Sequence, residues 1–171
     1  MLRGFIDHRE RGTAMSANRT LGADMSVRVV DDAGAWQWSA LAYAQLREFS
    51  SQFASVKADR SGVTPTLDQF SVPSTGIGAR MEVRRVGDAS EWRIGADTRY
   101  VEGRTQEFYS YAANGLPQRI RRAGGNSVTA GLYGEYSHQL SAPLLATMSL
   151  RYDHYTIGRG YLRERPIAGA L

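Results

Sequence analysis

Hydrophobic and polar residues alternate with a period of two along most of this chain. The clearest example is residues 128–157, where VTAGLYGEYSHQL is followed by the break Ser141-Ala142-Pro143 and then by LLATMSLRYDHYTI. Alternation with this period is typical of β-strands, because successive side chains of a strand point to opposite faces of a sheet. The break between the two runs predicts a β-hairpin.

The same alternation predicts four earlier strands, so the expected fold class is all-β, an antiparallel up-and-down meander of about six long strands. The earlier strands are expected at residues 20–30, 35–49, 75–86 and 91–102. Short turns are predicted at 31–34, 87–90 and 139–143, and loops at 1–19, 50–74, 103–126 and 158–171. The sheet is therefore expected to have tight turns at one end and long loops at the other.

One phase of every predicted strand is free of charged residues. A soluble antiparallel sheet also alternates, with its apolar face on a core. Here, however, the apolar phase is rich in Ala, Thr and Gly, and the strands are longer than the ~5–6 residues typical of globular sheets. Aromatic residues lie near both strand ends: Trp36, Trp92 and Tyr136 near the short turns, Tyr100 and Tyr152 toward the long loops. A small apolar band between two aromatic rims is typical of an outer-membrane β-barrel.

Composition excludes several other classes. The 21 basic and 17 acidic residues leave a net charge of +4 that is spread along the chain, which argues against a nucleic-acid partner. The absence of Cys excludes disulfides and thiolate chemistry. Residues 1–12 lack the apolar core of a signal peptide, so either the protein is cytoplasmic or the chain is an internal piece whose signal lies elsewhere.

Candidate catalytic chemistry is lacking. His8, His138 and His154 are scattered without metal-ligand spacing, so no metal, cofactor or enzymatic activity is expected. Asp97 and Glu135 can be imagined as an acid/base pair, but carboxylates partnered by arginines are the simpler interpretation.

Two segments, Ala130–Tyr136 and Leu144–Tyr155, carry a resemblance to the β-barrel of TonB-dependent outer-membrane receptors. Within the second, Leu150–Tyr155 (LRYDHY) is similar to the LRYD-x-Y strand of those barrels, and the segment Tyr109–Gly125 resembles one of their loops. The resemblance extends over essentially the whole chain. Family barrels have about twenty-two strands and a plug. Residues 1–171 are therefore expected to be a partial barrel domain, a mid-barrel fragment without plug, energy-coupling box or remaining strands.

The resemblance implies TonB-dependent uptake of a large nutrient, such as a ferric siderophore, at the outer membrane of a Gram-negative cell. Implied partners are the plug domain, TonB, outer-membrane lipid and lipopolysaccharide. Aromatic and arginine side chains suit an anionic chelate or a sugar, so an extracellular loop is expected to bind ligand through Tyr109, Tyr111, Arg119, Arg121 and Arg122. The alternative for this loop is plain solvation, or arginine contacts to lipopolysaccharide phosphates.

Charged residues in the other phase of the strands are expected to face the lumen of the barrel and to form ion pairs. The members of this set are Asp97, Arg99, Glu135, Arg151 and Asp153. Two alternatives of other classes stay open: a plugless porin-like barrel, and a soluble β-sheet binding module.

Overall fold

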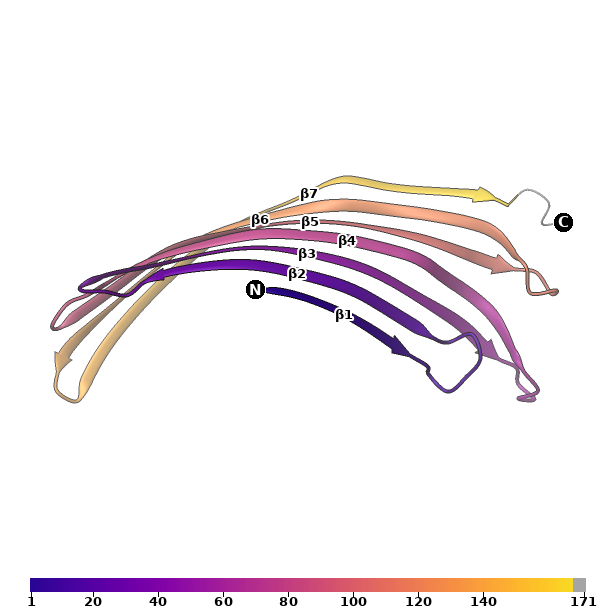
Figure 1. Ribbon diagram of the computed structural model, residues 1–171, viewed down its shortest axis with the longest axis horizontal. Helices are drawn as coiled ribbons and strands as arrows, with labels where there is room; N and C mark the ends of the chain where they lie inside the picture. Colours follow the sequence, from indigo (N-terminus) through magenta and orange to yellow (C-terminus); the bar gives the residue numbers. More distant parts are fainter. Residues whose placement is uncertain (168–171) are drawn as a thin grey trace.

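The computed structural model describes residues 1–167 as one antiparallel sheet in which each strand pairs with the next along the chain (Figure 1). The strands are β1 (Leu2–Arg9), β2 (Asn18–Asp31), β3 (Trp36–Val56), β4 (Val63–Val86), β5 (Ser90–Tyr111), β6 (Pro117–Ser141) and β7 (Leu144–Pro166). The all-β, up-and-down prediction is confirmed. No helix in this part of the chain is long and apolar enough to cross a membrane.

The number and length of the strands differ from the prediction. There are seven strands in the described residues, because Leu2–Arg9 pairs with β2 inside the segment 1–19 predicted to be a loop. The segments 50–74 and 103–126, also predicted to be loops, are hairpins with connections of only residues 57–62 and 112–116.

The fourth predicted loop, 158–171, is largely strand as well, since β7 continues to Pro166, while residues 168–171 lie outside the described residues. In the extensions of β5, β6 and β7 charged residues lie on both faces, as Arg121 and Arg122 show, so hydrophobic alternation is lost there. Backbone pairing continues regardless, because the ladder uses peptide groups and not side chains. The short strand β1 does alternate, with Leu2 and Ile6 on the apolar face and Arg3 and Asp7 on the other.

The strand register sorts the side chains onto two faces. Ala42 pairs with Ala79, Ala79 with Thr98 and Thr98 with Ala130, so the uncharged phases of neighbouring strands lie side by side. We call this the apolar face, and we call the opposite one, which carries Asp97 and its neighbours, the charged face. Large side chains of the apolar face are open: Leu150 is 79% and Met148 is 74% exposed. Among residues 1–167, Ile120 alone is a buried hydrophobic side chain.

The sheet is open and curved along its strands (Figure 1). β1 and β7 form its two edges, and the described residues contain no pairing between them. Short connections gather at one end, where β6 and β7 are joined by residues 142–143, and longer ones, such as residues 10–17, at the other.

Glycines on the charged face allow bulky side chains to lie flat across a strand. A Cβ atom on Gly95 would overlap the ring of Tyr133, and one on Gly78 would overlap the ring of Tyr43. Each aromatic ring covers the glycine of the next strand, an arrangement known to compensate for glycine in sheets. The Tyr133 ring thereby crosses β5 from its origin on β6.

Candidate functional site

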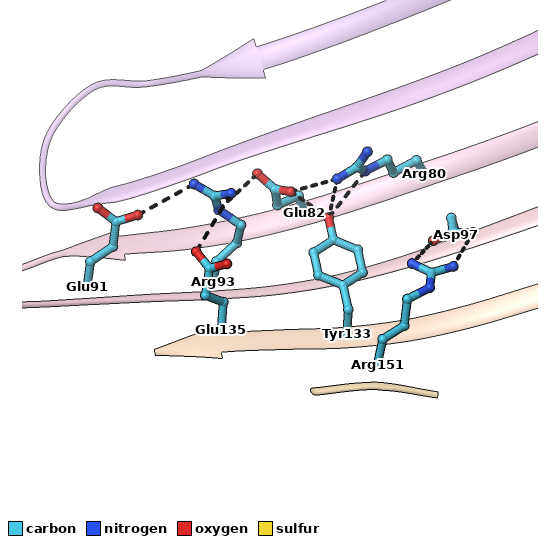
Figure 2. A network of polar contacts seen from close by, with 8 residues as sticks. All are labelled: Arg80, Glu82, Glu91, Arg93, Asp97, Tyr133, Glu135 and Arg151. Carbon is cyan, nitrogen blue, oxygen red and sulfur yellow. Dashed lines mark hydrogen bonds and ion pairs between the residues drawn. The ribbon is translucent and has the colours of Figure 1, made fainter. Parts of the chain in front are cut away.

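Tyr133 is the centre of a hydrogen-bond network on the charged face (Figure 2). Its hydroxyl group donates to Glu82 Oε2 at 2.5 Å and accepts from Arg80 Nη2 at 2.8 Å. Both partners are on β4, so the side chain reaches over Gly95 of β5 to a strand two places away. The Arg80 guanidinium also lies 5.2 Å from the centre of the ring, within the range of a cation–π contact.

A ladder of alternating charges continues from this network toward the short-turn end (Figure 2). Arg93 lies between three carboxylates, 3.6 Å from Glu82, 3.6 Å from Glu91 and 4.0 Å from Glu135. Glu91 also accepts a hydrogen bond from Arg84 at 2.5 Å. Beyond the aromatic rim at Trp92, the Arg84 contact lowers the pKa of Glu91 below its usual range. Every carboxylate of this ladder therefore has a cationic neighbour.

Arg151 forms a second junction, between β7 and β5. Its Nη1 and Nη2 atoms donate to the two carboxylate oxygens of Asp97 at 2.9 and 3.2 Å, and its Nε and Nη2 atoms donate to Asp153 at 2.9 and 2.6 Å. The guanidinium passes over Gly131 of β6, where a Cβ atom would collide with it. Gly131 on β6 therefore makes room for Arg151 in the same way that Gly95 on β5 makes room for Tyr133.

The five charged residues expected to face a lumen all lie on the charged face, in different surroundings. Asp97, Arg151 and Asp153 form one cluster, and Glu135 belongs to the ladder of Arg93. Within residues 1–167, Arg99 has no carboxylate within 4.0 Å. That this face lines a lumen stays a prediction.

The residues expected to bind ligand lie in the paired strands of the β5–β6 hairpin and not in a loop. Tyr109 and Tyr111 are on β5, and Arg119, Arg121 and Arg122 are on β6. The Arg119 and Arg121 guanidinium groups lie 5.9 and 4.8 Å from the centre of the Tyr109 ring. Arg122 follows Arg121 in a paired strand, so its side chain points to the opposite face and the group is not a single cluster.

Glu107 anchors the cluster around Tyr109. It is only 3% exposed, is hydrogen-bonded by Arg121 and accepts a hydrogen bond from Gln69 Nε2 at 3.3 Å. Glu164 of β7 completes the cluster at 3.8 Å from Arg119 and 3.6 Å from Arg121. The Glu107 contact raises the pKa of Arg121 above its ordinary value, and partial burial raises the pKa of Tyr111, with the nearby Asp68 carboxylate adding to it.

The sequence did not predict that Tyr133 would be the centre of the network on β4 to β6, or that Glu107 would anchor the cluster around Tyr109. Tyr133 and Glu107 look like ordinary strand residues, and their partners come from strands whose register the sequence does not reveal. One signal was present: Gly95 and Gly131 occupy charged-phase positions in strong strands, where glycine often marks the close approach of another group.

The charged face offers fixed charges and hydrogen-bonding groups. Among residues 1–167, no three His, Asp or Glu side chains gather as they would around a metal ion. The arrangement suits a rigid polar wall that contacts charged molecules.

Comparison with protein families places these features in a known context. A family model described as TonB dependent receptor-like, beta-barrel matches residues 3–166, which is nearly the whole chain. Comparison with curated proteins and with solved structures gave no match.

Proposed function

The chain belongs to the TonB-dependent receptor-like β-barrel family, and on that basis we propose that it forms part of the wall of an outer-membrane transport receptor. Proteins of this family are transporters and not enzymes. The cargo we propose is a large, scarce nutrient, such as a ferric siderophore, whose uptake is driven through a plug domain and TonB.

The observation that carries this proposal is the separation of the two faces. Leu132, Met148 and Leu150 are open to the surroundings on the apolar face, and the charged face is tied together by ion pairs. Moving one such Leu or Met side chain out of water is worth about 1.5–3 kcal/mol. A sheet with a whole face of this kind is stable where lipid covers that face.

The height of the apolar band supports a membrane position. On β5 the band extends from Trp92 to Tyr100, close to the ~9–11 residues that a tilted strand needs to cross a bilayer. Trp92 meets Trp36 of β3 edge to face, with ring centres 5.2 Å apart, at the short-turn rim. Aromatic residues favour this level because their rings are apolar at one end and wet at the other.

The open edges of the sheet point to a larger barrel. The outward backbone groups of β1 and β7 would be unpaired in lipid, and each such group costs several kcal/mol there. We therefore propose that residues 1–171 are one part of a barrel domain and that further strands pair with both edges. In the closed wall the charged face would line the lumen and meet the plug.

Ligand capture is proposed for the part of the charged face beyond the membrane. The guanidinium groups of Arg119 and Arg121 lie over the ring of Tyr109, 5.9 and 4.8 Å from its centre, and Tyr111 lies at the end of the same strand. Guanidinium groups beside an aromatic ring can bind carboxylate or catecholate oxygens of an anionic chelate while its rings stack. Arg122 is not part of this site because it belongs to the opposite face.

The two-face assignment can be tested by single cysteine substitutions, since residues 1–171 contain no Cys. In outer-membrane vesicles from cells that produce the protein from its own reading frame, Leu132→Cys and Met148→Cys should react with an apolar maleimide but resist a charged one. Thr129→Cys and Arg99→Cys, on the other face, should react with the charged reagent. Recovery of the protein in the cytoplasm, or equal labelling of both faces, would contradict the proposal and favour a soluble sheet.

A transport assay separates an energy-driven receptor from a plugless porin-like barrel. Uptake of a panel of radiolabelled ferric siderophores is compared in cells with and without TonB. The receptor proposal expects uptake that disappears without TonB and falls for Arg119→Gln. Uptake that is independent of TonB would instead support the passive barrel.

A further inference from the structure

Glu164 reaches the cluster around Tyr109 because of an irregularity in β7. Two residues of β7, Arg159 and Gly160, lie opposite one residue of β6, Gly125, and so form a β-bulge. Arg159 has a φ of 52°, in the left-handed region that residues other than glycine seldom adopt. Strained positions of this kind are often found near ligand sites, where the surrounding structure holds them in place.

The bulge decides which charge β7 places beside the arginines of β6. Glu164 pairs with Arg121 because the bulge takes up one extra residue. Regular pairing would shift β7 by one position and put Arg163 opposite Arg121. Arg165 would then lie opposite Arg119. Since side chains of like charge directly opposite each other destabilise a sheet, the bulge replaces two repelling arginines by one carboxylate on the charged face.

Glu164 contacts both arginines of the cluster, but loosely. Its carboxylate oxygens lie 3.8 Å from Arg119 Nη2 and 3.6 Å from Arg121 Nη1. Both distances exceed the roughly 2.7–2.9 Å of a charge-assisted hydrogen bond. The Glu164 side chain is also 34% exposed. An exposed ion pair of this kind is weak, because water screens it and both side chains lose freedom when it forms.

Glu107, the other carboxylate of the cluster, is held firmly. It is 3% exposed and accepts hydrogen bonds from Arg121 and Gln69. Displacing it would leave a buried charge without a partner, which is strongly unfavourable. Among residues 1–167, Glu164 is the only carboxylate within 4.0 Å of Arg119. A ligand that enters the cluster can therefore displace Glu164 but not Glu107, and Arg119 is the guanidinium group that becomes free.

We propose that Glu164 competes with the ligand for Arg119 and Arg121 and thereby selects cargo by its negative charge. A cargo molecule with several anionic oxygens binds both guanidinium groups at hydrogen-bond distance and moves Glu164 aside. A molecule with a single weak acceptor gains too little to replace the carboxylate and stays unbound. The inference rests on the proposed function, and it adds the residue that sets how strongly anionic the cargo must be.

The test measures anion binding at Arg119 directly and without transport. The protein, extracted in detergent from its own cells, is treated with phenylglyoxal, which modifies arginines, and mass spectrometry gives the modified fraction of Arg119. Tricarballylate, a tricarboxylate, is the probe, and the concentration that protects half of Arg119 is determined. We expect Glu164→Gln to lower this concentration about three- to tenfold, as the removal of a weak, exposed competitor should.

The matched control is Glu102→Gln. It removes the same charge from an exposed glutamate of β5 that lies on the apolar face, and it should leave the half-protection concentration unchanged. The uncharged triamide of the probe should not protect Arg119 in any of the proteins. Heat-modifiability on gels verifies that both variants are folded.

Each of four results would overturn the inference. A change of less than about threefold in Glu164→Gln, or no protection in any protein, would show that Glu164 does not compete at this site. An equal decrease in Glu102→Gln would indicate a general effect of net charge, and protection by the triamide would show that negative charge is not selected. Failure of the proposed function is recognised separately, because siderophore uptake would then not depend on Arg119, whatever the protection assay shows.

Discussion

Gly95→Ala should destabilise the protein by displacing the ring of Tyr133. The added Cβ atom would overlap the ring, and the backbone of β5 is held between β4 and β6, so the tyrosine must swing away. Its hydroxyl group then loses the hydrogen bonds to Glu82 and Arg80. A hydrogen bond to a charged group contributes about 1.5–3 kcal/mol.

The expected magnitude takes the exposure of the partners into account. Glu82 is 21% exposed, so its bond keeps most of its value, whereas Arg80 is 55% exposed and its bond to the hydroxyl is screened by solvent. We therefore expect a loss of about 2–3 kcal/mol in the free energy of unfolding, the full value of one charged hydrogen bond and a small part of a second.

The assay is urea unfolding of the detergent-extracted protein, followed by tryptophan fluorescence. In a Tyr133→Ala background the ring is absent, so Gly95→Ala should cost less than about 0.5 kcal/mol, and the two substitutions should be strongly non-additive. Gly134→Ala is the matched control on β6, because the nearest atom to its new Cβ is Arg93 O at 3.9 Å. An equal cost of Gly95→Ala in both backgrounds would refute the reasoning.

Three further predictions follow from the other contacts. Glu107→Gln leaves Arg121 beside a buried neutral side chain and should lower the free energy of unfolding by about 3 kcal/mol. This is the low end of the range for a broken buried ion pair, because Arg121 is 35% exposed. Urea unfolding measures the loss, and a loss below about 1 kcal/mol would contradict the prediction. Gly131→Ala should displace Arg151 from Asp97 and Asp153 and speed heat-induced unfolding on gels, whereas wild-type behaviour would show that the guanidinium finds another path. The Asp59 carboxylate accepts hydrogen bonds from the backbone N–H and the hydroxyl of Ser61, and these lower its pKa below the ordinary value of 3.8. The contact in this turn is therefore complete above pH 3.8 and is lost as the pH falls through the lower pKa of the folded state. The chemical shift of the Ser61 amide in NMR spectra should report this titration, and Asp59→Asn should abolish it.

Hydrophobic alternation predicted the strands well where a strand crosses the apolar band. It failed in the long extensions of β3 to β7, of which those of β5 to β7 carry charged residues on both faces. It also missed the short strand Leu2–Arg9, although Leu2 and Ile6 alternate there with Arg3 and Asp7. A pattern method reads the contrast between faces, and no contrast remains outside the band, although backbone pairing persists. The extensions therefore became visible only in the structure.

The candidate sites were predicted to a smaller extent for a related reason. Alternation within a strand assigns side chains to faces, so the common face of Asp97 and Arg151 followed from the sequence once their strands were known. In the predicted loop no face was assigned, and Arg121 and Arg122 were grouped although their side chains point in opposite directions. The contacts of Tyr133 with β4 depend on inter-strand register, which the sequence does not encode locally.

The glycine crossings have a consequence for how a ligand or plug would meet the charged face. Tyr133 over Gly95 and Arg151 over Gly131 each join strands two places apart, so these side chains reinforce the backbone ladder across an intervening strand. Their charges are already satisfied, and a passing anion would have to break an ion pair to use them. Arg99 has no carboxylate within 4.0 Å among residues 1–167 and lies on the same face as Asp97, so it can receive an acidic group without that cost. Along this part of the wall, an acidic partner is therefore expected to contact Arg99 before any arginine of the network.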